Sequence, residues 1–201
     1  MKGKIVVITG ASGGIGSALA ETFSRQGAVT VLAARSLGAM NELAARLPGP
    51  ADVVELDVTS DASVAEAVRG IVQRHGRVDV WINNAGYGAF KAFADTGMDE
   101  FAGIMDVNFF GTVRCTRAVL PHMLERGSGH IVNIASMAGK VGTAKSAAYT
   151  ASKFAVRGFT QSLRMELRGT GVRVSAVNPG PVRTAFFQLA DPSGRYLHSL
   201  P

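Results

Sequence analysis

The sequence has one cysteine, one tryptophan and no long apolar run, and these shortages exclude several classes of protein. A single cysteine, Cys115, cannot form an internal disulfide, so the chain does not resemble a small disulfide-stabilised secreted domain. No apolar run approaches the length that crosses a bilayer. The four histidines and Cys115 also lack the spacing of metal ligands. We therefore expect a cytoplasmic protein without a metal site or membrane contact, with Cys115 packed in the core.

The chain carries a net positive charge that is spread along the sequence. The net charge is +6, yet Lys and Arg are scattered, with no basic run and no interleaved aromatic residues. This pattern speaks against nucleic-acid binding and suits an anionic cofactor. The N-terminus does not predict a secretory signal, because Lys2 and Lys4 precede only four apolar residues. At 201 residues with 47% hydrophobic content, residues 1–201 are expected to form one domain.

Short apolar runs alternate with stretches of helical periodicity along the chain. Continuous apolar runs of this length are typical of strands buried on both faces of a parallel sheet. The alternation predicts an α/β fold of the Rossmann type, a doubly wound parallel sheet in the order 3-2-1-4-5-6 with helices on both faces. Strands are predicted at residues 5–8, 29–34, 53–56, 78–82, 129–135 and 172–177, and helices at about residues 18–26, 37–47, 62–75, 98–125 and 147–169.

A glycine-rich turn separates the first strand from the first helix. Thr9-Gly10-Ala11-Ser12-Gly13-Gly14-Ile15-Gly16 lets a ligand approach the backbone, and the helix that follows offers unpaired N–H groups and a positive dipole end. Strand, glycine turn and helix in this order predict an anion site of the dinucleotide-binding kind. It is not a P-loop, because no Gly-Lys-Ser/Thr closes the motif.

The second strand ends at Ala34, and Arg35 follows it. An NAD site usually has an acidic residue here to hold the ribose 2′-hydroxyl. Arginine instead suits a 2′-phosphate, through charge-assisted contacts. The alternative is a solvated surface arginine. This position favours NADP(H) over NAD(H).

Polar residues follow the later strands, at the edge where parallel sheets bind ligands. Asp57 and Val58 end the third strand, Asn83 and Asn84 the fourth, and Ser136 the fifth. The Asn pair could bind a ligand or serve a structural role. Asn108 falls inside a helical pattern that also carries Gly103 and Gly111, which makes a local distortion there plausible.

Tyr149 and Lys153 lie four residues apart in a segment of helical periodicity, so both side chains fall on one helix face. A lysine beside a tyrosine favours the phenolate and lowers the tyrosine pKa, which prepares the phenol for general acid or base catalysis. An isolated pair of this spacing is more often exposed and inert. Its meaning depends on the other motifs.

Together these motifs resemble the main single-domain branch of the short-chain dehydrogenase/reductase family. The match covers Thr9-Gly10-x-x-x-Gly14-Ile15-Gly16, Asp57-Val58, Asn83-Asn84-Ala85-Gly86, Asn108, Ser136, Tyr149-x-x-x-Lys153 and Pro179-Gly180 with Thr184. The resemblance implies that the pyrophosphate and adenosine side is lined by Gly10, Ser12, Gly14, Ile15 and Gly16. It also implies that Asp57 and Val58 hold the adenine, and that Asn84, Ala85 and Gly86 stabilise the sheet and flank the ribose. It also implies that Pro179, Gly180, Val182 and Thr184 position the nicotinamide carboxamide.

The resemblance also implies a mechanism of hydride transfer between NADP(H) and a small carbonyl or secondary alcohol. Tyr149 would exchange a proton with the substrate oxygen, while Lys153 would lower its pKa and bind the nicotinamide ribose. Ser136 would donate a hydrogen bond to that oxygen. Asn108 would hold a water that links Lys153 to solvent. Tyr87, Met137, Val141, Phe186 and Phe187 are candidates for an apolar substrate pocket or for ordinary packing.

The chain stops at Pro201, where the family usually continues through a helical loop, a further helix and a seventh strand. Residues 191–195 are expected to form a loop. The short C-terminus could be natural or a truncation, and a homodimer through the Asn108 and Tyr149 helices remains possible. A nucleotide-binding sensor or scaffold without turnover is the main alternative. An epimerase or dehydratase using the Tyr/Lys pair is disfavoured by the glycine spacing and the absence of a larger substrate domain.

Overall fold

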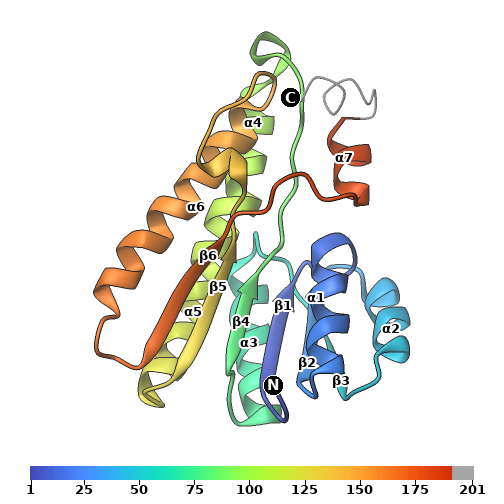
Figure 1. Ribbon diagram of the computed structural model, residues 1–201, viewed down its shortest axis with the longest axis vertical. Helices are drawn as coiled ribbons and strands as arrows, with labels where there is room; N and C mark the ends of the chain where they lie inside the picture. The colour runs from blue at the N-terminus through green and yellow to red at the C-terminus, as the bar shows by residue number, and fades with distance from the viewer. Residues whose placement is uncertain (192–201) are drawn as a thin grey trace.

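Strands and helices alternate through the computed structural model, which describes residues 1–191 (Figure 1). The strands are β1 (Ile5–Thr9), β2 (Val29–Ala34), β3 (Ala51–Glu55), β4 (Val80–Asn83), β5 (Gly129–Ile134) and β6 (Val172–Val177). The helices are α1 (Gly14–Arg25), α2 (Leu37–Arg46), α3 (Asp61–His75), α4 (Met98–Met105), α5 (Gly111–Glu125), α6 (Ala147–Glu166) and α7 (Ala185–Ala190). Shorter helical turns are η1 (Phe93–Asp95), η2 (Asp106–Phe110) and η3 (Met137–Gly139).

The sheet confirms the predicted topology. Its strands are parallel and lie in the order β3-β2-β1-β4-β5-β6. The strand order reverses between β1 and β4, and ligands of such sheets bind beyond the carboxyl ends at this point. In Figure 1 the chain begins at one end of the sheet and α7 lies beyond the other, above the carboxyl ends.

Alternate residues of β1 show why the sheet carries helices on both faces. Ile5 and Val7 pack with residues of α3, α5 and α6, whereas Val6 and Ile8 pack with residues of α1 and α2. These β1 side chains are all buried, so a continuous apolar run is required rather than a polar and apolar alternation. Cys115 lies in the first cluster and is fully buried, as predicted.

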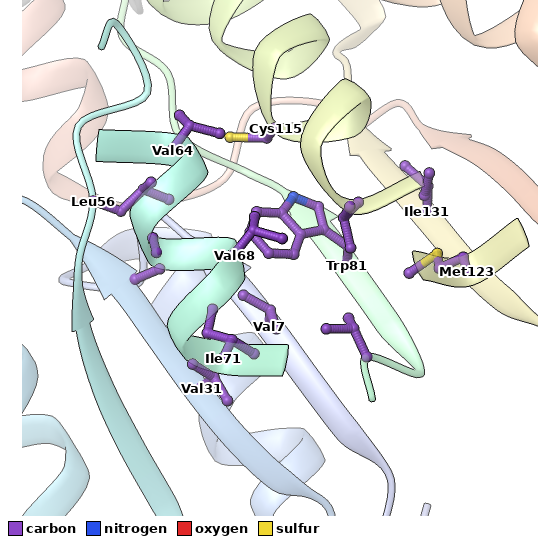
Figure 2. Close-up of a cluster of buried hydrophobic side chains, with 14 of the residues drawn as sticks. Val7, Val31, Leu56, Val64, Val68, Ile71, Trp81, Cys115, Met123 and Ile131 are labelled. Atoms are coloured by element: carbon purple, nitrogen blue, oxygen red, sulfur yellow. The ribbon is translucent and has the colours of Figure 1, made fainter. Parts of the chain in front are cut away.

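Trp81 is the largest buried side chain and lies where α3 and α5 cover the sheet. Figure 2 shows its ring beside Val68, with Val64 and Cys115 farther along the same cluster. Its indole N–H donates to Asn83 Oδ1 at 2.8 Å, so the one polar atom of the ring is paired.

A buried hydrogen-bond network continues from Trp81 through Asn83 and Asn133, which face each other across β4 and β5. Asn83 Nδ2 donates to Asn133 Oδ1 at 2.8 Å and to Thr116 Oγ1 at 3.0 Å. Asn133 Nδ2 donates to Thr160 Oγ1 at 2.8 Å. Because Thr116 lies on α5 and Thr160 on α6, the network ties both helices to the middle of the sheet.

Several predicted boundaries were wrong. β3 begins at Ala51 rather than residue 53, because Ala51 and Asp52 pair with Thr30 and Val31 of β2. β4 begins at Val80 rather than residue 78 and includes Asn83, whose pairing with Asn133 keeps it in the sheet. α1 starts at Gly14, earlier than the apolar pattern indicated.

The long helix predicted over residues 98–125 is divided into three parts. α4 and α5 are separated by η2, a π-helical segment centred on Asn108, which confirms the local distortion expected there. The helix α7 was not predicted. Of the predicted loop at 191–195, residues 192–195 lie outside the described residues.

Among residues 1–191, no helix has both the length and the apolar character needed to cross a membrane.

Candidate active site

A cleft of about 1300 Å³ opens beyond the carboxyl ends of the strands and brings most of the predicted site residues together. Two predicted residues, Gly16 and Asn108, do not line it and act from behind its wall. The lining includes the predicted residues Gly10, Ser12, Gly14, Ile15, Arg35, Asp57, Val58, Asn84, Ala85, Gly86, Tyr87, Ser136, Met137, Val141, Tyr149, Lys153, Pro179, Gly180, Val182, Thr184, Phe186 and Phe187.

The glycine turn between β1 and α1 requires glycine at three of its positions. Gly10 and Gly14 have φ angles of +63° and +58°, which side-chain-bearing residues rarely adopt. A Cβ on Gly16 would lie 2.4 Å from the Gly10 carbonyl oxygen and 2.8 Å from Asn84 Nδ2. Gly16 therefore allows α1 to pack against the turn and Asn84, rather than forming the cleft surface.

The N-terminus of α1 meets the cleft without a capping side chain, because its N-cap residue is Gly13. The first backbone N–H groups of a helix need partners outside the helix, and an anion can supply them. Thr184 closes over this turn, since a Cβ on Gly14 would meet its side chain at 3.6 Å. The turn can hold a phosphate group, as the sequence predicts.

Asn84 serves the structural role that the sequence left open. Its Nδ2 donates to the carbonyl oxygens of Thr9 and Gly10 at 3.0 and 3.1 Å. The Thr9 hydroxyl oxygen in turn accepts from the backbone N–H groups of Asn84 and Ala85, both at 3.0 Å. These contacts join the ends of β1 and β4 and fix the glycine turn beside the Asn84-Ala85-Gly86 loop.

Asp57 and Arg35 lie on the side of the cleft formed by the ends of β2 and β3. Asp57 Oδ1 accepts from the Thr59 hydroxyl at 2.7 Å and from the Thr59 backbone N–H at 2.9 Å. These hydrogen bonds, with smaller help from the Arg35 charge, hold the pKa of Asp57 below its ordinary value. An ionised carboxylate and a guanidinium therefore face this part of the cleft.

Tyr149 and Lys153 lie one turn apart on α6, and the lysine is buried rather than exposed. The Lys153 side chain places Nζ 5.7 Å from the centre of the Tyr149 ring. Nζ donates to the Ile134 carbonyl oxygen at 2.8 Å. Burial lowers the pKa of Lys153 to about 8. At neutral pH the ammonium form still predominates beside the phenol.

Ser136 follows β5 and caps η3. Its Oγ accepts from the backbone N–H of Ala138 at 3.1 Å. A hydroxyl that accepts in this way keeps its own hydrogen for donation to another oxygen. Ser136 and Tyr149 both line the cleft.

Asn108 holds the loop after β4 against α6. Its Oδ1 accepts from the Tyr87 backbone N–H at 2.9 Å, and its Nδ2 donates to the Tyr87 carbonyl oxygen at 2.9 Å. Nδ2 also donates to Ser152 Oγ at 3.0 Å, and the Ser152 hydroxyl donates to the Tyr149 carbonyl oxygen at 2.7 Å. The π-helical segment thus contacts the turn of α6 that carries Tyr149 and Lys153 through one buried amide.

Aromatic side chains gather around Tyr149 at the other end of the cleft. The Phe90 ring packs edge-on to Tyr149 at 5.7 Å and is stacked with Phe187 at 5.8 Å between centroids. Phe186 lies 5.5 Å from Tyr149. The Phe90 backbone N–H donates to the Ala190 carbonyl oxygen at 2.9 Å, which attaches α7 here. Met137 and Val141 add exposed apolar surface to the cleft.

Sequence reasoning missed several cleft residues, including Phe90, Gly88 and Ile134. A Cβ on Gly88 would lie 3.1 Å from both Tyr149 Cδ2 and Phe186 Cζ, so glycine admits these rings. The sequence signal for Gly88 was its position two residues after Gly86, in the same loop. Ile134 contributes through its backbone oxygen, which no side-chain pattern reveals. The other missed lining residues include Gly13, Ala34, Ser36, Leu56, Thr59, Gly103, Asp106, Thr143, Pro181 and Leu189.

Comparisons with known proteins agree with this geometry. The family model described as short chain dehydrogenase matches residues 4–193. The chain belongs to the short-chain dehydrogenase family. An uncharacterised oxidoreductase of Staphylococcus epidermidis is 39% identical to this short-chain dehydrogenase over 191 residues, covering 95% of the chain and 83% of the relative.

Two solved structures of the family resemble the short-chain dehydrogenase closely. Actinorhodin polyketide ketoreductase with NADPH is 34% identical in sequence and superposes with a TM-score of 0.93. The match covers 100% of this chain and 80% of the ketoreductase. A short-chain dehydrogenase/reductase from Burkholderia phymatum in complex with NAD is 33% identical, with a TM-score of 0.90 over 96% and 70% of the two chains. The family assignment makes this protein an NAD(P)-dependent oxidoreductase.

Proposed function

We propose that this short-chain dehydrogenase transfers hydride between NADP(H) and a small carbonyl or secondary alcohol, with Tyr149 as the general acid and base. The observation that carries the proposal is the meeting of Ser136, Tyr149 and buried Lys153 in one cleft with the glycine turn. Residues 1–201 would form a single unit for both cofactor binding and catalysis. The free, buried Cys115 fits a cytoplasmic protein.

The residue types that line the cleft support binding of a nicotinamide dinucleotide. The α1 N-terminus and glycine turn would bind the pyrophosphate, while Asp57 and Val58 would hold the adenosine side. Pro179, Gly180, Val182 and Thr184 would border the nicotinamide. The cofactor supplies the hydride. No part of this assignment requires a metal ion.

The protein's own contribution to the reaction is orientation and proton transfer. Ser136 would donate a hydrogen bond to the substrate oxygen, and Tyr149 would give that oxygen a proton as negative charge develops on it. The Lys153 ammonium, held by Ile134, favours the phenolate that remains. Asn108 would act on Tyr149 and Lys153 from behind, by fixing α6 and ordering water.

The substrate end of the cleft favours an apolar carbonyl compound. The cleft carries the rings of Phe90, Phe186 and Phe187 in the cluster that contains Tyr149. Met137 and Val141 add aliphatic lining elsewhere on its wall. Such a wall binds by removing apolar surface from water, at roughly 25 cal/mol per Å².

A turnover screen tests this function. The intact protein is given NADPH or NADH and a panel of apolar ketones and aldehydes, while loss of reduced cofactor is followed by absorbance. We expect turnover with NADPH and at least one carbonyl. Binding of NADPH by fluorescence, without turnover across the panel, would favour a nucleotide-binding sensor or scaffold instead.

Replacing Arg35 with alanine tests the cofactor preference. A charge-assisted contact with the 2′-phosphate is worth about 1.5–3 kcal/mol, so we expect R35A to raise the KM for NADPH about tenfold or more. The KM for NADH should change less than about twofold, because that cofactor lacks the phosphate. Arg46, exposed at the end of α2, gives the matched control R46A. An equal loss with both cofactors would contradict the assignment.

We also propose a homodimer through the helices that carry Asn108 and Tyr149. Phe110, Phe154 and Met165 are exposed apolar side chains on or next to these helices. Light scattering should give twice the chain mass for the wild-type protein and a smaller mass for Phe154→Glu. A wild-type monomer at the concentrations used for activity would rule out this interface.

A further inference from the structure

One partly buried arginine outside the predicted site reaches toward its adenosine side. Arg114 lies on α5, and its side chain is 23% exposed. Its Nη1 forms an ion pair with Asp106 Oδ1 at 2.7 Å and lies 3.3 Å from the Val58 carbonyl oxygen. Its Nε is 3.4 Å from Asp61 Oδ1, at the start of α3. One guanidinium therefore contacts η2, the loop after β3 and α3.

The partners of Arg114 border the place proposed for the adenosine. Val58 and Asp106 both line the cleft. The Arg114 charge also contributes to the lowered pKa of Asp57, behind the larger effect of its hydrogen bonds with Thr59. The loop 57–59 is thus contacted from α5 by a residue that does not itself line the cleft.

A second observation on α5 points to the same loop. Gly111 is one turn before Arg114, and a Cβ there would lie 2.8 Å from Val58 Cγ2 and 2.9 Å from Val58 Cβ. Glycine in the middle of a helix costs about 1 kcal/mol relative to alanine, so its presence allows a contact that alanine would prevent. Val58 is therefore packed against Gly111 while its carbonyl faces Arg114.

The same arginine also holds the π-helical segment that contains Asn108. Besides the Asp106 carboxylate, Nη1 lies 3.5 Å from the Asp106 carbonyl oxygen. The Thr112 hydroxyl donates to the Asn108 carbonyl oxygen at 2.9 Å in the next turn. The contacts of Arg114 therefore connect the adenosine side of the cleft to the segment that fixes Tyr87 and α6.

We propose that Arg114 is a positioning residue for cofactor binding, which holds the loop 57–59 in register with η2 so that the adenosine site is formed before the cofactor arrives. It acts through Val58 and Asp106 and does not itself contact the substrate or the nicotinamide. This inference rests on the proposed function, because it assumes that Asp57 and Val58 receive the adenosine. When the loop 57–59 is already ordered in the free protein, cofactor binding does not have to offset the entropy lost by ordering it.

The test measures binding of adenosine fragments, which requires no turnover. Calorimetry is carried out on the full chain with 2′,5′-ADP and with 5′-AMP, for wild type and for Arg114→Met, which keeps a long side chain without charge. We expect Arg114→Met to raise the Kd of both fragments about tenfold. At saturating NADPH its kcat should stay within about twofold of wild type, since none of the contacts of Arg114 is with Ser136, Tyr149 or Lys153.

Arg117→Met is the matched control, because Arg117 is an exposed arginine on the same helix. It should bind both fragments as wild type does. Thermal unfolding of both variants separates a general loss of stability from a local effect on the loop. A second variant, Gly111→Ala, strengthens the helix but displaces Val58, so it should also raise the fragment Kd about tenfold.

The outcomes separate this inference from the proposed function. Unchanged fragment binding in Arg114→Met, or a fall in kcat with unchanged binding, overturns the positioning role and leaves the function intact. Failure of wild type to bind any adenosine fragment overturns the proposed cofactor site and this role with it. A raised Kd in Arg114→Met but not in Arg117→Met supports the positioning role.

Discussion

Tyr149→Phe is expected to lower the rate of carbonyl reduction about a thousandfold, the size of effect expected when a general acid is removed. Phenylalanine keeps the ring that packs against Phe90 and Phe186, so the aromatic cluster should survive the change. The variant loses only the hydroxyl that would transfer a proton. Stopped-flow or steady-state absorbance of NADPH measures the rate, and fluorescence titration measures cofactor affinity.

The affinity of Tyr149→Phe for NADPH should remain within about threefold of wild type, because the residues proposed to bind the phosphates and adenosine lie elsewhere in the cleft. Phe187→Leu is a useful control, since it alters the same aromatic cluster without touching an acid or base. If Tyr149→Phe turns over at the wild-type rate, another group must supply the proton, and the assignment of Tyr149 fails.

Lys153→Met is expected to lower turnover at least about a hundredfold while making the cofactor-free protein more stable at pH 7. Burial of the ammonium lowers the pKa of Lys153 from 10.5 to about 8, so the charged form carries a desolvation cost. Methionine has a similar length and no charge. Removing this desolvation cost should raise the free energy of unfolding by on the order of 1–3 kcal/mol. Loss of the hydrogen bond from Lys153 to the Ile134 carbonyl oxygen reduces that gain.

The stability difference between Lys153→Met and wild type should depend on pH in a defined direction. Between pH 8 and 10.5 the unfolded wild-type chain holds a proton that the folded chain has released, so wild-type stability rises with pH. The advantage of Lys153→Met is therefore largest below pH 8 and disappears above about 10.5. Urea unfolding at several pH values measures this difference.

Lys2→Met is the matched control, because Lys2 is exposed near the N-terminus. It should show neither the gain in stability nor its loss at high pH. A Lys153→Met protein that is less stable than wild type at pH 7 would indicate that the ammonium is stabilised in the folded state, against the expected cost of burial.

The sequence predicted the sheet order well because each strand of the interior is a short apolar run and each helix has a clear apolar face. It placed the ends of β3 and β4 less well. Asp52 and Asn83 are polar, yet both belong to strands, because their neighbours across the sheet supply the pairing. Local composition does not contain those partners. The helix α7 was missed for a related reason, since its aromatic residues pack on Phe90, far away in the sequence.

The candidate site was predicted residue by residue where a side chain carries the chemistry. Ser136, Tyr149 and Lys153 are examples, and the structure brings all three to one cleft. Contacts made by backbone atoms or by packing could not be predicted. The Ile134 carbonyl that receives the Lys153 ammonium, and the close approach of Gly111 to Val58, exist only once the helices are placed. Arg114 gave no signal either, because a lone arginine on a helix is ordinarily solvated.

The buried network from Trp81 to α6 runs in one direction. Each group donates to the next, from the indole to Asn83, then Asn133 and then Thr160, whose hydroxyl donates to the Val156 carbonyl oxygen within α6. This order also fixes which way round each amide lies. None of these groups titrates in the working range of an enzyme. These hydrogen bonds between the sheet and α6 therefore do not depend on pH, whereas the charge of Lys153 on the same helix does.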